Sequence, residues 1–250
     1  MALFSASSYF SLDWACKIPT GYHDWRQATF ARIIASVLIL FFIWQVTPQT
    51  LTRFRFPKFD MNFIWVLLAM VYFNIPHFRA GQVEYGSFGK FLSVFIFSIG
   101  IGLNEEILSR GLIFSIFEKK SVWVATAVSA ISFGAMHIPN MFLGQDRTYT
   151  IMQVITASAS GVLLAGLMIY SGSIWVPILM HTLWDFPLVT IKNLGRHHYS
   201  LSPKELLYEF LYDLFQVAVG LCFIWMAKSR QEECARANLR MHKDLIPEVN

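Results

Sequence analysis

Ionisable side chains stand at helical spacing inside three apolar blocks of the sequence. They form the motifs E-E-x-x-x-R over residues 105–110, F-x-x-x-H over 133–137 and H-x-x-x-D over 181–185. A charged side chain in hydrocarbon costs at least ~2.5 to 3.5 kcal/mol even on the forgiving insertion scales, so each group needs a polar partner or a hydrated cavity. The three motifs therefore predict a polar site built within apolar helices.

The first motif combines two carboxylates with one guanidinium. Glu106 and Arg110 are four residues apart and share a helix face, so they can form an ion pair within the helix. Glu105 is rotated by about 100° from Glu106 and can point at another partner. We expect Arg110 to neutralise Glu106 as a scaffold and Glu105 to be available for proton transfer. In the alternative interpretation, both carboxylates share Arg110 as a packing device.

The second motif places Phe133 and His137 on a common helix face. If the third and fourth apolar blocks form an antiparallel hairpin about residues 119–120, Glu105 and His137 lie at depths that differ by about 4 to 5 Å. We therefore predict a contact between Glu105 and His137.

The third motif pairs an imidazole with a carboxylate one turn later. Asp185 can fix the tautomer of His181 or accept its proton. Measured from the turn at residues 171–173, His181 lies roughly 13 Å deep, whereas Glu105 lies roughly 22 Å deep on its own helix. A meeting of these two side chains requires helix tilt or turns at unequal depth.

These groups can activate water, but no activated nucleophile accompanies them. The sequence has no G-x-S-x-G elbow. A carboxylate and an imidazole can deprotonate a water that attacks a carbonyl, and His181 can donate to the resulting oxyanion. We expect no cofactor. In the alternative, Glu105, His137 and His181 hold zinc, although the H-E-x-x-H spacing is absent.

The composition places these motifs in a membrane. Hydrophobic residues make up 55% of the chain, charged residues make up 14%, and the mean hydropathy is +0.48. We predict an all-α, polytopic bundle of about seven spans, with six to eight allowed, because about 20 helical residues cross a hydrocarbon core. The expected spans are residues 28–47, 61–76, 88–117, 122–138, 150–170, 174–191 and 207–227.

The rest of the chain is assigned to the membrane surface or to water. Residues 1–27 are expected to lie along the interface, and residues 228–250 are expected to form a charged, solvated tail. The basic residues fall in short loops and tails, as anionic headgroups favour, so the net charge of +4 does not indicate nucleic-acid binding. In the fifth span, Ala157, Gly161 and Ala165 form a small-residue stripe that predicts close helix packing.

Together the three motifs resemble those of the CPBP family, the CAAX proteases and bacteriocin-processing enzymes, also called abortive-infection-type membrane proteins. The likeness covers roughly residues 90–190 of a domain that spans 28–227. It implies a glutamic intramembrane protease of prokaryotic type, in which Glu105 and His137 activate water while His181 and Asp185 stabilise the oxyanion. Eukaryotic CAAX-processing members carry asparagine where this chain has Asp185, and an ionised aspartate only accepts hydrogen bonds.

The sequence thus predicts an intramembrane endopeptidase that cleaves a membrane protein or lipid-modified peptide, with C-terminal processing or sorting as one role. Glu106, Arg110 and Phe133 would support the site. The lipid bilayer is the other partner, and a bacterial or archaeal cell membrane is the expected location. Two alternatives remain: a non-proteolytic immunity factor, chaperone or proton-coupled transporter, and a metal-dependent membrane protease.

Overall fold

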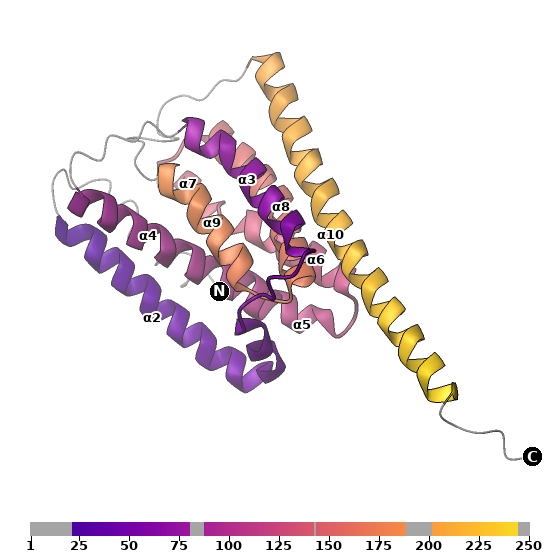
Figure 1. Cartoon of the computed structure of the whole chain (residues 1–250). Coiled ribbons are helices and arrows are strands. Elements are labelled where there is room, and N and C mark those ends of the chain that lie inside the picture. The colour runs from indigo at the N-terminus through magenta and orange to yellow at the C-terminus, as the bar shows by residue number, and fades with distance from the viewer. Residues whose placement is uncertain (1–21, 81–87, 143, 189–201, 245–250) are drawn as a thin grey trace, which may run out of the picture.

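The computed structural model describes residues 22–80, 88–142, 144–188 and 202–244, and every regular element in these ranges is a helix (Figure 1). The elements are α2 (Tyr22–Val46), η1 (Pro48–Phe54), α3 (Phe63–Ala80), α4 (Phe88–Glu106), η2 (Ile107–Ile113), α5 (Phe114–Glu118), α6 (Val122–Ala135), α7 (Pro139–Phe142), α8 (Arg147–Ser171), α9 (Trp175–Leu188) and α10 (Pro203–Asp244).

Each of the seven predicted spans corresponds to a helix or a helical run. Five of these runs are long and apolar enough to cross a membrane, and a shorter apolar helix covers Phe63–Phe78. The remaining one, α9, has 14 residues, or about 21 Å, which is less than the ~30 Å hydrocarbon core. The predicted polytopic, all-helical membrane bundle is confirmed.

The largest differences from the predicted boundaries are at three places. The block predicted as one helix over 88–117 is α4 followed by a π-helix, η2, and then the short α5. The helix predicted to end at residue 227 continues to Asp244, because the charged segment after it is still a good helix former. Of the predicted interfacial segment, residues 1–21 lie outside the described residues and the remainder is part of α2.

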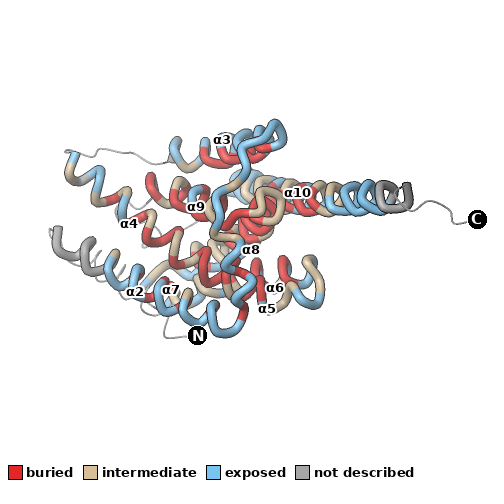
Figure 2. The backbone as a smooth tube through the Cα atoms, turned by 60° about the horizontal axis from the view of Figure 1, so that its bottom comes forward, coloured by how far each residue is buried: buried red, intermediate tan, exposed pale blue. Residues whose placement is uncertain are grey.

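Exposed residues lie on the outside of the bundle and buried residues gather on its central helices (Figure 2). Large side chains such as Phe30, Phe41, Val71 and Trp225 are more than half exposed. In water such a surface would be a liability, but in a bilayer it faces lipid tails. The burial pattern therefore agrees with an integral membrane protein.

Small residues allow the helices to cross closely, as predicted for the stripe on α8. A Cβ atom added to Gly161 would lie 2.8 Å from Cα of Ala130 on α6. One added to Gly166 would lie 2.3 Å from the carbonyl oxygen of Gly220 on α10. Only glycine fits at such crossings, where packing rather than the hydrophobic effect holds helices together.

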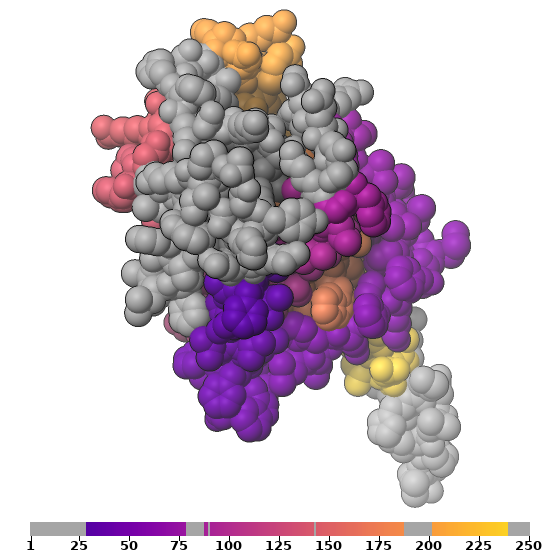
Figure 3. Space-filling view, turned by 90° about the vertical axis from the view of Figure 1, so that its left-hand side faces the viewer, coloured from indigo at the N-terminus to yellow at the C-terminus, as the bar shows by residue number. Residues whose placement is uncertain are grey.

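The short helix α9 is the inner element of the bundle. It packs against α3, α4 and α8, and most of its described residues are buried. From one side, part of α9 is visible at the surface between α2 and α3 (Figure 3). The third motif is therefore carried by a helix that is packed between segments from distant parts of the chain.

Candidate active site

The first motif lies where α4 changes into the π-helix η2. The backbone N–H of Phe114 donates to the carbonyl oxygen of Ser109, a bond between residues five apart that defines the wider turn. The hydroxyl of Ser129 on α6 donates to the same oxygen at 2.9 Å. Such π segments are frequent at functional sites, and here the segment follows directly after Glu105 and Glu106.

Arg110 and Glu106 form the ion pair that the sequence predicts. Nη1 of Arg110 lies 3.0 Å from Oε1 of Glu106, and both side chains have no exposed surface. Nη2 donates to the carbonyl oxygen of Gly161 at 3.1 Å, and the guanidinium lies 4.4 Å from the ring centroid of Phe133. A buried charge needs such partners, so Arg110 joins the first motif to α6 and α8.

Three carboxylates surround the imidazole of His181. Nδ1 lies 3.0 Å from Oε1 of Glu106. Nε2 lies 3.4 Å from Oδ2 of Asp185 and 3.8 Å from Oε2 of Glu105. Because an ionised carboxylate only accepts hydrogen bonds, Nδ1 donates its proton to Glu106 and Nε2 faces the other two acids.

The partner that orients His181 differs from the one expected. Asp185 was expected to fix the tautomer or to accept the proton of His181; Glu106 holds Nδ1, while Asp185 lies 3.4 Å from Nε2, where it can accept that proton. The sequence does not reveal this contact, because Glu106 and His181 are 75 residues apart. Glu106 therefore connects the buried guanidinium of Arg110 to an imidazole of the site.

The turn before α9 is packed against the end of η1 and the η1–α3 connection. Ser173 and Ile174, which precede α9, are fully buried. The N–H of Ile174 donates to the carbonyl oxygen of Arg53 at 2.9 Å, and the hydroxyl of Ser173 donates to that of Arg55 at 2.7 Å. These bonds fix the start of α9, and along the helix His181 meets the two glutamates of the first motif.

Gly102 brings α4 and α9 together one turn before the two glutamates. A Cβ atom at this position would lie 2.6 Å from Oγ1 of Thr182 and 2.9 Å from the carbonyl oxygen of Ile178. Real Cβ atoms do not approach other atoms so closely. The absence of a side chain at residue 102 therefore permits the contact between Glu106 and His181.

The second motif places one ring between two imidazoles. Phe133 contacts His181 edge-on, with centroids 5.5 Å apart, and His137 edge-on, with centroids 5.6 Å apart. Phe133 and His137 were predicted on one helix face, but α6 ends at Ala135 and His137 lies in the turn after it, where its Nδ1 is 3.1 Å from the carbonyl oxygen of Phe133. The charge of Glu105 acts on His137, while the predicted direct contact between them stays a prediction.

Arg32 is a residue of this neighbourhood that the sequence reasoning missed. It lies on α2, is 2% exposed, and covers the ring of Phe97 at 4.6 Å. Its charge acts on the carboxylate of Asp185. The signal was present, because an arginine inside the apolar block 28–47 needs a partner just as Arg110 does.

The described residues contain no group of three or more His, Cys, Asp or Glu side chains arranged to hold a metal ion. Glu105, His137 and His181, the alternative zinc ligands, do not form such a group in the described part of the chain.

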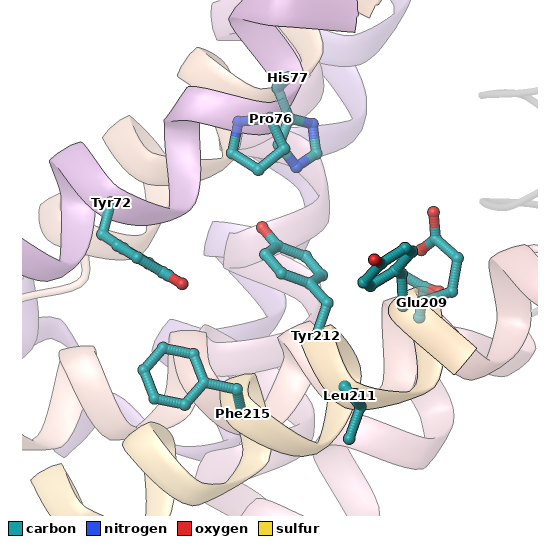
Figure 4. A pocket seen from close by; sticks show the side chains of 9 residues that line it. Tyr72, Pro76, His77, Glu209, Leu211, Tyr212 and Phe215 are labelled. Atoms are coloured by element: carbon teal, nitrogen blue, oxygen red, sulfur yellow. The ribbon is translucent and has the colours of Figure 1, made fainter. Parts of the chain in front are cut away.

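A cavity of about 560 Å³ lies beside the site, between α3, α8 and α10 (Figure 4). The hydroxyl of Tyr212 donates to the carbonyl oxygen of Phe73 at 3.2 Å. His77, on the cavity wall, stacks on Trp184 at 5.4 Å, and Trp184 directly precedes Asp185. The lining side chains are largely aromatic and include none of the three motifs.

Residues 87–187, which hold all three motifs, match the model of the family "Type II CAAX prenyl endopeptidase Rce1-like". The chain is also 23% identical over 179 residues to "Putative membrane peptidase YdiL" of Bacillus subtilis (strain 168), covering 64% of this chain and 68% of the relative. No solved structure matches. The resemblance predicted from the motifs is confirmed, because the part of this membrane protein that carries them matches the Rce1-like family of CAAX prenyl endopeptidases.

Proposed function

We propose that this protein is an intramembrane endopeptidase in which Glu105 and His137 activate a water and His181 stabilises the oxyanion. One observation carries the proposal: side chains of the first and third motifs meet at Nε2 of His181, with Phe133 of the second motif against the same ring. The motifs lie on three separate helical runs, and the family match supports a membrane endopeptidase in general terms.

The two neighbouring glutamates differ in burial and in their ionic partners. Glu106 is fully buried and is occupied by Arg110 and His181. The side chain of Glu105 is 16% exposed, and its nearest ionic contact, with His181, is a loose 3.8 Å. A general base must reach a water and release a proton afterwards, so Glu105 is the better candidate of the two.

His181 is the better candidate for the oxyanion donor. Its Nδ1 is held by Glu106, so the ring is fixed in orientation and Nε2 is the nitrogen that faces Glu105 and Asp185. A donor that is oriented before the reaction stabilises developing charge without reorganisation. With Nδ1–H donating to Glu106, Nε2 donates to the oxyanion when the ring carries a proton on both nitrogens.

We further propose a substrate that lies in or near the membrane, either a membrane protein or a lipid-modified peptide. The site is enclosed by apolar helices, and the family model is named for enzymes that act on prenylated C-terminal peptides. Processing near a C-terminus is therefore the first activity to test. A bacterial or archaeal cell membrane is the proposed location, in keeping with the bacterial relative.

The proposal is tested with the full chain in liposomes. A quenched fluorescent peptide with a lipidated cysteine near its C-terminus, and the same peptide without the lipid, serve as probes. We expect cleavage of the lipidated peptide and a loss of 10²-fold or more in Glu105→Gln, since general-base catalysis contributes about that factor. Glu209→Gln removes a half-buried carboxylate on α10 outside the motifs and should cleave normally.

Other outcomes separate the alternatives. Cleavage that survives in Glu105→Gln would contradict the proposed base. Inhibition by a chelator with recovery on adding zinc would indicate a metal-dependent protease. Absence of cleavage together with proton-coupled flux in empty liposomes would indicate a transporter that uses the same groups as a relay.

A further inference from the structure

A second cavity, of about 280 Å³, lies at the end of the bundle where α8 finishes and α3 begins. Its walls come from the η1–α3 connection, the α8–α9 turn and α10. The charged and polar side chains that matter for its chemistry are Arg55, Lys58, Asp60, Tyr170, Arg230 and Gln231. None of them belongs to the three motifs.

The cavity carries more positive than negative charge. Asp60 is its acidic residue, and Oδ1 accepts hydrogen bonds from the N–H groups of Asn62 at 2.9 Å and Phe63 at 3.1 Å. This carboxylate is therefore engaged in capping the first turn of α3. The charge of the cavity is therefore set by its three cations, Arg55, Lys58 and Arg230.

The cations are held at the cavity in different ways. Arg230 donates a hydrogen bond to the hydroxyl of Tyr170, and its guanidinium lies 4.3 Å from the centroid of that ring. Nη2 of Arg55 lies over Gly172, 3.5 Å from where a Cβ would be. Arg55 and Lys58 form no ion pair within the described residues, so their donors are available to an anion.

Strongly exposed apolar side chains lie on the connection between η1 and α3, beside the cavity. Phe56 is 77% exposed, Phe59 is 79% exposed and Met61 is 87% exposed. Phe56 also stacks on Trp175 with ring centroids 5.8 Å apart. Tryptophan and tyrosine gather in the headgroup region of the bilayer, so Tyr170 of the cavity wall and Trp175 beside Phe56 place the cavity at that depth.

We propose that this cavity binds the phosphate of an anionic phospholipid headgroup, with Arg55, Lys58 and Arg230 as donors and the acyl chains beside Phe56. Basic pockets between transmembrane helices are suited to such headgroups. A soluble phosphate would gain nothing from the exposed aromatic side chains. A zwitterionic headgroup would need an acceptor for its ammonium, and Asp60 is already engaged.

The distribution of basic residues between the two sides of the membrane agrees with this occupant. The loops and tail on this side of the predicted topology, at 48–60, 118–121 and 228–250, carry ten Lys and Arg, against seven on the other side. An excess of basic residues marks the cytoplasmic side, where anionic lipids gather. The cavity therefore lies where its proposed ligand is abundant.

The test compares two lipids with the same acyl chains, phosphatidylglycerol and phosphatidylcholine, added to the full chain in neutral detergent. Lipid retention is measured by native mass spectrometry and affinity by titration. We expect preferential retention of phosphatidylglycerol and a loss on the order of 30-fold in affinity for R55Q/K58Q, because each cation near an anionic headgroup contributes roughly fivefold. K119Q/K120Q removes the same charge from an exposed turn and should keep the preference.

Several outcomes would overturn the proposal. They are equal retention of the two lipids, an unchanged preference in R55Q/K58Q, or the same loss in K119Q/K120Q. Competition by glycerol phosphate or inorganic phosphate at concentrations similar to those of the lipid would instead indicate a site for a soluble anion. If circular dichroism shows that R55Q/K58Q has lost helix, the single change Lys58→Gln is measured, with a loss of roughly fivefold expected. The readout is lipid binding, so the result does not depend on the proposed protease activity.

Discussion

Oε1 of Glu106 lies 3.0 Å from Nδ1 of His181 and also accepts a hydrogen bond from Arg110. One oxygen atom thus connects a buried guanidinium to the imidazole at the centre of the site. This arrangement separates the two adjacent glutamates into a structural acid, Glu106, and a more accessible one, Glu105.

Glu105→Gln and Glu106→Gln should therefore fail in different ways. We expect Glu106→Gln to lower the free energy of unfolding by about 3 to 5 kcal/mol, since it leaves Arg110 as a buried charge without its counterion. Glu105→Gln should unfold like the original protein and lose peptide cleavage. Thermal unfolding in detergent and turnover are measured on both. Equal stability of the two variants would contradict the scaffold role of Glu106.

Gly102→Ala tests the close crossing of α4 and α9. The added Cβ would overlap Thr182 and the backbone of Ile178, so we expect a destabilisation of about 1 to 3 kcal/mol, as for overpacked cores, and reduced cleavage. Gly100→Ala is the matched control, because its Cβ would meet no atom closer than 3.7 Å. If both variants behaved alike, the crossing at residue 102 would not position the site.

Arg32 and Asp185 should be energetically coupled. Arg32→Gln removes the positive charge that acts on the Asp185 carboxylate, so we expect slower turnover, with part of the loss recovered when Asp185→Asn is added. A double-mutant cycle on turnover should give a coupling of roughly 0.5 to 3 kcal/mol. Arg53→Gln, which removes a cation paired with Glu118, provides the comparison. Strictly additive effects of Arg32→Gln and Asp185→Asn would argue against the coupling.

Phe133→Leu tests the ring that lies between the two imidazoles and under Arg110. Loss of the cation–π contact and of ring packing should cost about 1 to 2 kcal/mol of stability and should slow cleavage as the imidazoles lose their spacer. Phe114→Leu removes a buried ring under Arg53, so it should lower stability without a matching effect on turnover. Similar turnover in the two variants would assign Phe133 to packing alone.

Sequence periodicity predicted the helices, because helix formation follows short-range rules. The convergence of the motifs was predicted from the cost of burying charge in a bilayer. Seven apolar blocks predicted seven helical runs, and the spacing of Glu106 and Arg110 predicted their ion pair. The cost of a charge in hydrocarbon then required the polar groups to find one another. These arguments use residues that are close in sequence or a general property of the bilayer.

The features that were missed depend on contacts between distant segments. The contact of Glu106 with His181 and the buried turn before α9 are set by helix crossings such as the one at Gly102. In the π-helix η2, the carbonyl oxygen of Ser109 accepts a hydrogen bond from the hydroxyl of Ser129, which is 20 residues away in the sequence. Arg32 could have been identified by applying to α2 the argument that was applied to Arg110.

The length of α10 determines where its distal part lies. At 42 residues and 1.5 Å per residue, the helix extends for about 63 Å, twice the thickness of a hydrocarbon core. Residues 231–239 are all exposed, and the helix beyond residue 230 holds its far end roughly 20 Å away from the packed bundle. A protease site or epitope placed on this rigid rod will be cut or recognised from one compartment only, so it reports which side of the bilayer the basic loops occupy.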